Sequence, residues 1–232
     1  MTGTAGTNSP FPGGFAVTHA DFTASRPAGA EEDVHMVPTV VDQVIKRLSQ
    51  PGDMVLDPFA GFGTTLGRAL ALGRRAVGVE LLPERVDHIR EHIPDACIVE
   101  GDARALREVL SGALPTLGRG GVDLIVSSPP YMTETHHDAD PLTAYEENTG
   151  NYPRYLAELG LVAAQCADLL KRGGFIVWNV ADIHHMGHTT HLVDDCARVL
   201  AQHFSPIGAT PISWDRLPHD LVADALLVFR RL

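Results

Sequence analysis

The stretch from Met54 to Thr65 constrains the fold of this chain more than any other part of it. Apolar Met54, Val55 and Leu56 follow a turn at Pro51-Gly52, as a buried parallel strand does. The strand is followed by Asp57-Pro58-Phe59-Ala60-Gly61-Phe62-Gly63-Thr64-Thr65, in which two glycines let the backbone bend close to a ligand. A strand, a glycine-rich turn and a helix in this order begin a doubly wound α/β sheet of the nucleotide-binding kind.

The rest of the chain continues this alternation. Further apolar strands are predicted at 76–80, 97–99, 122–126, 175–180, 207–214 and 225–230, with amphipathic helices between most of them. The predicted fold is a Rossmann-like α/β fold, with a seven-stranded, mostly parallel sheet and helices on both faces. With 232 residues, 44% of them hydrophobic, the chain can bury one sizeable core. We expect a single domain over residues 31–232, preceded at 1–30 by a flexible leader rich in Gly, Thr, Ala, Ser and Pro.

Acidic residues stand at three successive strand ends. Asp57 closes the first strand, Glu80 the second, and Asp102 follows the third. Ligands of such sheets bind outside the carboxyl ends of the strands, and a ribose-binding acid is expected about 20 residues beyond the glycines. No lysine follows the glycines, so the turn does not match a phosphate-cradling loop. These features favour a cationic ligand with a free ribose and an amine, such as S-adenosylmethionine. The alternative is that each acid only caps the helix after it.

The fourth predicted strand ends in Ser128-Pro129-Pro130-Tyr131. With this tetrapeptide and the stretch 57–65, the chain resembles the DNA amino-methyltransferases, which modify exocyclic nitrogens of cytosine or adenine. The resemblance covers most of residues 35–232, and the serine form is the one more typical of N4-cytosine enzymes. It implies S-adenosylmethionine as cofactor and Ser128, Pro129, Pro130 and Tyr131 as catalytic residues. The cofactor-binding residues that it implies are His35, Asp57, Pro58, Phe59, Ala60, Gly61, Gly63, Thr64, Thr65, Glu80, Leu81, Asp102 and Ala103.

The chemistry of an exocyclic base amine explains such a tetrapeptide. The amine is a poor nucleophile because its lone pair is delocalised into the ring. Acceptors such as the Ser128 hydroxyl and the Pro129 carbonyl would favour a pyramidal nitrogen and stabilise the charge that develops on it. Tyr131 can stack on an extruded base, which is worth about 1–3 kcal/mol. An ordinary proline turn is the alternative interpretation of this motif.

The charge of the chain opposes binding of a phosphate backbone. The chain carries a formal net charge of −11, whereas affinity for nucleic acid grows with basic residues that neutralise phosphates. The loop 132–152 contains the acids Glu134, Asp138, Asp140, Glu146 and Glu147 without Lys or Arg, and we expect no separate target-recognition domain. Arg26, Arg154 and Arg216 are expected near the mouth of the site. DNA is the expected substrate, with a homodimer or a separate specificity partner supplying recognition; RNA, a small amine and a non-catalytic cofactor-binding role are the alternatives.

Other features indicate a cytoplasmic protein without a membrane segment. No apolar run is long enough to span a bilayer, and Cys97, Cys166 and Cys196 are odd in number and lie in apolar patterns. His136-His137 and the run of His184, His185, His188 and His191 suggest a metal. Gly187 interrupts the segment and no HExxH motif is present, so we predict no metal site. Phe62 is bulky where the family has a small residue, and Asn179 and Asp182 are candidates for the base pocket.

Overall fold

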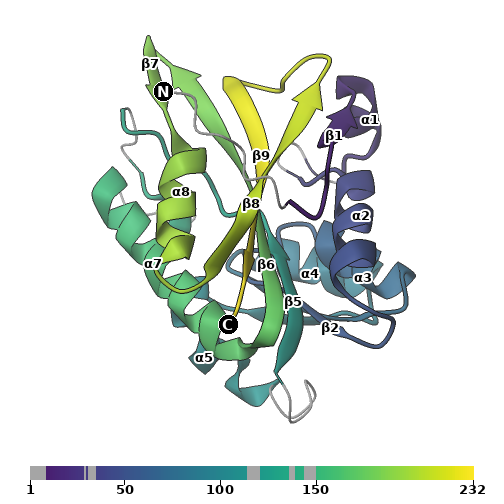
Figure 1. The fold of residues 1–232 in the computed structure, drawn as a ribbon. Helices are drawn as coiled ribbons and strands as arrows, with labels where there is room; N and C mark the ends of the chain where they lie inside the picture. The colour runs from purple at the N-terminus through teal and green to yellow at the C-terminus, as the bar shows by residue number, and fades with distance from the viewer. Residues whose placement is uncertain (1–8, 29, 31–34, 114–120, 136–138, 144–149) are drawn as a thin grey trace.

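The computed structural model describes residues 9–28, 30, 35–113, 121–135, 139–143 and 150–232. The strands it contains are β1 (Phe15–Val17), β2 (Met54–Asp57), β3 (Arg75–Glu80), β4 (Cys97–Glu100), β5 (Val122–Ser127), β6 (Leu170–His185), β7 (His188–Thr190), β8 (Ser205–Trp214) and β9 (Leu221–Arg230). They form one sheet in the order β1-β8-β9-β6-β5-β2-β3-β4, with β7 paired to β6 outside that path (Figure 1). Across the described ranges, none of the helices is long and apolar enough to cross a membrane.

The predicted sheet is confirmed, with two strands added. Strands β2 to β6 run parallel to one another, whereas β9 is antiparallel to β6 and β8. The additional strands β1 and β7 are both three residues long, too short for an apolar alternation to reveal them in the sequence. The order of the chain through the sheet reverses at β2, which has β3 on one side and β5 on the other. The carboxyl ends of β2 and β5 therefore flank the topological switch point, where such sheets bind ligands.

Helices cover both faces of the sheet (Figure 1). One layer consists of α2 (Pro38–Leu48), α3 (Thr64–Ala71) and α4 (Pro83–His92), and the other of α5 (Leu106–Val109), α7 (Tyr152–Leu169) and α8 (Leu192–Ala201). The apolar face of α2, with Val41 and Ile45 fully buried, packs in one core with Val55 and Leu124 of the sheet. The opposite core joins α7 and α8 to the other face of the sheet. The apolar residues of each helix recur at helical spacing and form one face, which packs against the sheet. The sheet, with its strand ends, is therefore held from both sides.

The ends of the helices follow local chemistry. Pro38 and Pro83 stand in the first turns of α2 and α4, where a missing N–H costs nothing. Asn151 precedes α7 and accepts a hydrogen bond from the Arg154 N–H at 2.9 Å, which satisfies one of the free donors of the first turn.

The N-terminal region departs from the predicted flexible leader. Within 9–28, Phe15–Val17 forms β1, which pairs in parallel with β8, and His19–Ala24 forms the helix α1. Phe15, Val17 and Phe22 are buried, so this segment contributes to the core. The prediction failed because one exposed residue between two buried ones is too short a pattern to distinguish from a linker. Residues 1–8 lie outside the described part of the chain.

Candidate functional site

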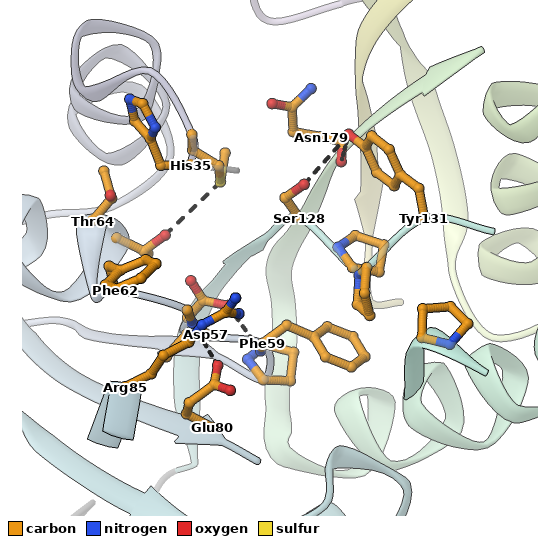
Figure 2. Close-up of a pocket in the computed structure, with 18 of the residues that line it drawn as sticks. His35, Asp57, Phe59, Phe62, Thr64, Glu80, Arg85, Ser128, Tyr131 and Asn179 are labelled. Carbon is orange, nitrogen blue, oxygen red and sulfur yellow. Dashed lines mark hydrogen bonds between the residues drawn. The ribbon is translucent and has the colours of Figure 1, made fainter. Parts of the chain in front are cut away.

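A cavity of about 600 Å³ opens at the carboxyl ends of the central strands (Figure 2). Every residue that the sequence assigns to the cofactor or to catalysis lines it, except Gly63. The cavity runs from the glycine turn after β2, past the ends of β3 and β4, to the Ser-Pro-Pro-Tyr segment after β5. We call the part around the glycine turn the cofactor arm. The acceptor arm is the part around Ser128, Tyr131, Asn179, Trp214 and Asp224.

The glycine turn adopts a backbone that few other residues allow. Gly61 and Gly63 have φ values of 54° and 83°, both in the left-handed region. A Cβ atom on Gly63 would lie 2.7 Å from Cδ1 of Ile93, so a side chain there would also displace the core. Gly63 therefore lies on the side of the turn that packs against Ile93, and it is the N-cap residue of α3. Gly61 and Thr64 line the cavity.

Glu80 holds the glycine turn in place. Its carboxylate accepts hydrogen bonds from the N–H of Gly61 at 2.7 Å and the N–H of Leu82 at 3.0 Å. Burial raises the pKa of Glu80, and these backbone donors oppose that rise. Each carboxylate oxygen accepts one backbone N–H and keeps a further lone pair, so the group can still accept a hydroxyl hydrogen from a ligand.

Asp57 is buried at the switch point. Its Oδ1 atom accepts the Ser127 hydroxyl at 2.5 Å and the Phe59 N–H at 3.0 Å. Burial raises the pKa of Asp57 to about 6, and the hydrogen bonds from Ser127, Thr65 and Phe59 limit the rise. The side chain ties β2 to β5 directly beneath the cavity and adds negative charge there.

Asp102 differs from the other two acids because a basic side chain pairs with it. Arg104 places its guanidinium Nη2 at 2.6 Å from Oδ2 of Asp102, and its other terminal nitrogen at 3.0 Å from Glu158 of α7. Asp102 also accepts the N–H of Arg104 at 2.7 Å, which caps the short 3-10 helix Ala103–Ala105. Helix capping was the alternative to ligand binding for all three acids, and Asp102 does cap a helix. Glu80 instead binds the turn, and Asp57 binds β5.

The Ser-Pro-Pro-Tyr segment is held by a directed chain of hydrogen bonds (Figure 2). The Ser128 hydroxyl donates to the Tyr131 hydroxyl at 3.4 Å, which in turn donates to the backbone oxygen of Asn179 at 3.2 Å. The Tyr155 hydroxyl of α7 donates to the Pro130 carbonyl at 2.8 Å. Burial raises the pKa of Tyr131, so its hydroxyl stays protonated and donates. With its hydrogen committed to Tyr131, the Ser128 oxygen presents lone pairs to the cavity.

The bulky residue of the glycine turn packs at the rim of the cofactor arm. The Arg85 guanidinium lies over the Phe62 ring, 5.1 Å from its centroid, and the His88 ring meets Phe62 edge to face with centroids 5.4 Å apart. Both Phe62 and Arg85 line the cavity. His35 also lines it and stacks on Phe22 with ring centroids 4.4 Å apart, so the N-terminal segment forms part of the wall.

The acceptor arm contains residues that the sequence analysis did not single out. Asp224 of β9 is 9% exposed and accepts hydrogen bonds from Asn179 Nδ2 at 2.5 Å and Trp214 Nε1 at 2.8 Å. Burial raises the pKa of Asp224 to about 6. The one available signal was that Asp224 is the single acid in the otherwise apolar run Leu221–Phe229. Trp214 also lines the cavity.

Several polar residues expected near the site do not line it. Arg26, Arg154 and Arg216 are absent from the cavity wall, and so is Asp182, which accepts the Val193 N–H at the start of α8. Pro141 and Leu142 of the loop 132–152 do line the cavity. Its residues 136–138 and 144–149, which include His136, His137, Asp138, Glu146 and Glu147, lie outside the described part.

The histidine-rich segment forms a hairpin. His184 belongs to β6 and His188 to β7, so the four-residue spacing does not place them on one helix face. His188 is 2.5 Å from Glu134, and His185 is 3.0 Å from Asp220. Among the described residues, no group of three or more His, Cys, Asp or Glu side chains is arranged to hold a metal ion.

Known proteins match the region of the sequence that contains the glycine turn. A family model described as DNA methylase matches residues 36–91. The DNA adenine methyltransferase YhdJ of Escherichia coli K12 is 45% identical over 47 residues, which make up 20% of this chain and 16% of that protein. The type II methyltransferase M.HinfI of Haemophilus influenzae is 49% identical over 45 residues, 19% of this chain and 12% of that protein. The matched stretches thus span less than a quarter of each of these relatives.

Solved structures match over most of the chain. A TehB-like SAM-dependent methyltransferase from Corynebacterium glutamicum has a TM-score of 0.54 at 17% identity, covering 83% of this chain and 87% of that one. A SAM-dependent methyltransferase from Methanosarcina mazei has a TM-score of 0.56 at 10% identity, covering 82% and 97%. The chain therefore has the class I methyltransferase fold, and its residues 36–91 are similar to the DNA methylase family.

Proposed function

We propose that the protein is an S-adenosylmethionine-dependent methyltransferase that modifies an exocyclic amino group of a DNA base in the cytoplasm, with cytosine N4 favoured over adenine N6. The observation that carries the proposal is one continuous cavity that joins the glycine turn to Ser128-Pro129-Pro130-Tyr131. The serine form of the tetrapeptide favours cytosine.

The residues of the cofactor arm fit the cofactor. Glu80 offers lone pairs to ribose hydroxyls, and the positive sulfur is favoured by the carboxylates of Asp57 and Glu80. Asp102 reaches the adenine amine in this proposal while it remains paired with Arg104. When bound, S-adenosylmethionine supplies an activated methyl group.

The residues of the acceptor arm prepare the receiving amine. The Ser128 oxygen and the Pro129 carbonyl accept hydrogen bonds from the amine hydrogens, which concentrates the nitrogen lone pair toward the methyl group. Tyr131, whose hydroxyl is tied to Asn179, gives the ring of the base a flat apolar surface. These contacts act on the base in a form extruded from the helix.

The experiment is methyl transfer from radiolabelled S-adenosylmethionine to DNA, followed by mass spectrometry of the digested nucleosides. We expect N4-methyldeoxycytidine, and a loss of about 100-fold or more in rate for Ser128→Ala, because an aligned polar contact to the reacting group is removed. Ser111→Ala, at an exposed serine, is the matched control. N6-methyldeoxyadenosine as the product would reassign the base, and no methylated DNA with full cofactor binding would contradict the DNA substrate.

A second candidate is methyl transfer to RNA or to a small amine, and the charge of the cavity favours the small amine. Among the lining residues in the described ranges, Arg85 is the one Lys or Arg side chain, whereas Asp220 and Asp224 face the acceptor arm. Carboxylates near the mouth oppose binding of a phosphate backbone. In the DNA proposal, a second copy of this chain or a specificity partner supplies the basic surface. Parallel reactions with total RNA and with small amines separate the two candidates.

A further inference from the structure

The carboxamide of Asn179 is held in one orientation. Its nitrogen donates to Oδ1 of Asp224 at 2.5 Å and to the carbonyl oxygen of Ala225 at 3.3 Å. Both partners are acceptors, so the amino end of the carboxamide must face them and its oxygen must face the other way. In the described part of the chain, no hydrogen bond engages that oxygen. Figure 2 shows the Asn179 side chain beside Ser128, extending into the space across from His35 and Thr64.

Asp224 is fixed in turn from its far side. The Trp214 indole N–H donates to its second oxygen at 2.8 Å, and β9 pairs with both β6 and β8, which carry Asn179 and Trp214. Asn179 and Trp214 both donate hydrogen bonds to Asp224, so both of its carboxylate oxygens act as acceptors. Other titratable groups that line the same cavity include Tyr131, His35, His219 and Asp220.

We propose that Asp224 is a positioning residue that orients the Asn179 carboxamide oxygen toward the acceptor arm, so that the site selects rings bearing an amino group over rings bearing a keto group. This inference rests on the proposed function and assigns the recognition of its amino group to particular residues. The wall of the acceptor arm then presents acceptors to the ring edge, from Ser128, Pro129 and Asn179. An amino group donates hydrogen bonds to these acceptors. A keto oxygen at the same place has no hydrogen to donate, so it faces the acceptors without a hydrogen bond.

The test compares probes that differ only in this group. Single-stranded oligonucleotides with one cytosine or one uracil, and the nucleosides cytidine and uridine, are bound to the full-length protein in the presence of S-adenosylhomocysteine, which prevents turnover. We expect wild type to bind the cytosine probe at least about 10-fold more tightly than the uracil probe, since an unpaired buried polar group has roughly this effect. In Asp224→Asn the preference is expected to fall below about 3-fold, because an asparagine there can donate to or accept from a reversed Asn179 carboxamide. Asp194→Asn, at an exposed aspartate of α8 that does not line the cavity, should keep the wild-type preference.

A second readout does not require a substrate. Because Trp214 is bonded to Asp224, its fluorescence is expected to change as Asp224 takes up a proton near pH 6, and this change should be absent in Asp224→Asn. In Asn179→Ala the fluorescence change should remain while the amino preference is lost. This separates the positioning role of Asp224 from a general loss of structure.

The outcomes separate this inference from the proposed function. Equal binding of the cytosine and uracil probes by wild type, or an unchanged preference in Asp224→Asn, contradicts the inference even if DNA is methylated. A clear amino preference without methyl transfer to any oligonucleotide supports the inference and contradicts the DNA substrate. Binding of none of the probes contradicts both.

Discussion

At the scale of single residues, Glu80 shows how one side chain serves both the fold and the ligand. Its two oxygens accept backbone N–H groups on either side, at Gly61 and Leu82, and so fix the left-handed turn that Gly61 begins. A carboxylate suits this position because both of its oxygens accept, whereas a carboxamide must turn an N–H toward one of the two backbone donors.

Glu80→Gln is therefore expected to weaken S-adenosylmethionine binding by about 10- to 100-fold, because a charge-assisted hydrogen bond to the turn is replaced by opposed donors. Isothermal titration calorimetry with the cofactor measures the change. Glu100→Gln is the matched control, since Glu100 is exposed and lies beside Glu80 in the register of β3 and β4. Equal cofactor affinity in the two variants would show that the Gly61 contact does not support binding.

At the scale of elements, a buried arginine joins the ends of two helices. Arg74 is 8% exposed and donates to the carbonyl oxygens of Ser49 and Leu72, at 2.8 and 2.6 Å. These residues terminate α2 and α3, whose last carbonyl groups otherwise lack partners. The positive charge also lies favourably at the negative ends of the two helices. The layer that carries the glycine turn is therefore anchored at the end far from the cavity.

Arg74→Met should lower the free energy of unfolding by about 2–4 kcal/mol, because buried carbonyl groups lose charged donors. Urea denaturation followed by circular dichroism measures this change. The neighbouring Arg75→Met is the control, since Arg75 is exposed and makes one longer contact, 3.2 Å to the Gly52 carbonyl. Similar losses in the two variants would assign the effect to charge rather than to the helix ends.

At the scale of the whole molecule, two buried carboxylates line the cavity, Asp57 in the cofactor arm and Asp224 in the acceptor arm. Burial raises the pKa values of both Asp57 and Asp224 to about 6. The folded protein then binds protons more readily than the unfolded chain, so these groups favour folding most below about pH 4, and that contribution is lost as the pH rises to about 6. The site thus carries a stability cost at neutral pH that a cationic ligand would offset.

Asp57→Asn removes one of these titrations. Relative to wild type, the cofactor-free variant should gain up to about 3 kcal/mol in unfolding free energy as the pH rises from 4 to 7, since each pKa unit corresponds to about 1.4 kcal/mol. Denaturation curves at several pH values give this difference, and Asp95→Asn, at an exposed aspartate, serves as the control. Parallel pH courses for Asp57→Asn and wild type would contradict a raised pKa in the fold.

The sequence by itself determined the parallel sheet, the helices on both faces and the strand ends that carry Asp57, Glu80 and Ser128. These follow from local rules: apolar runs of strand length, amphipathic helices, and a turn whose positive φ angles favour glycine. The tertiary structure alone decided which polar groups meet. Arg104 pairs with Asp102, Asp224 orients Asn179, and the short segment Phe15–Val17 joins β8. Each of these pairings joins groups from different strands or helices, or depends on a side-chain direction, and burial sets its strength, so no periodicity along the chain encodes it.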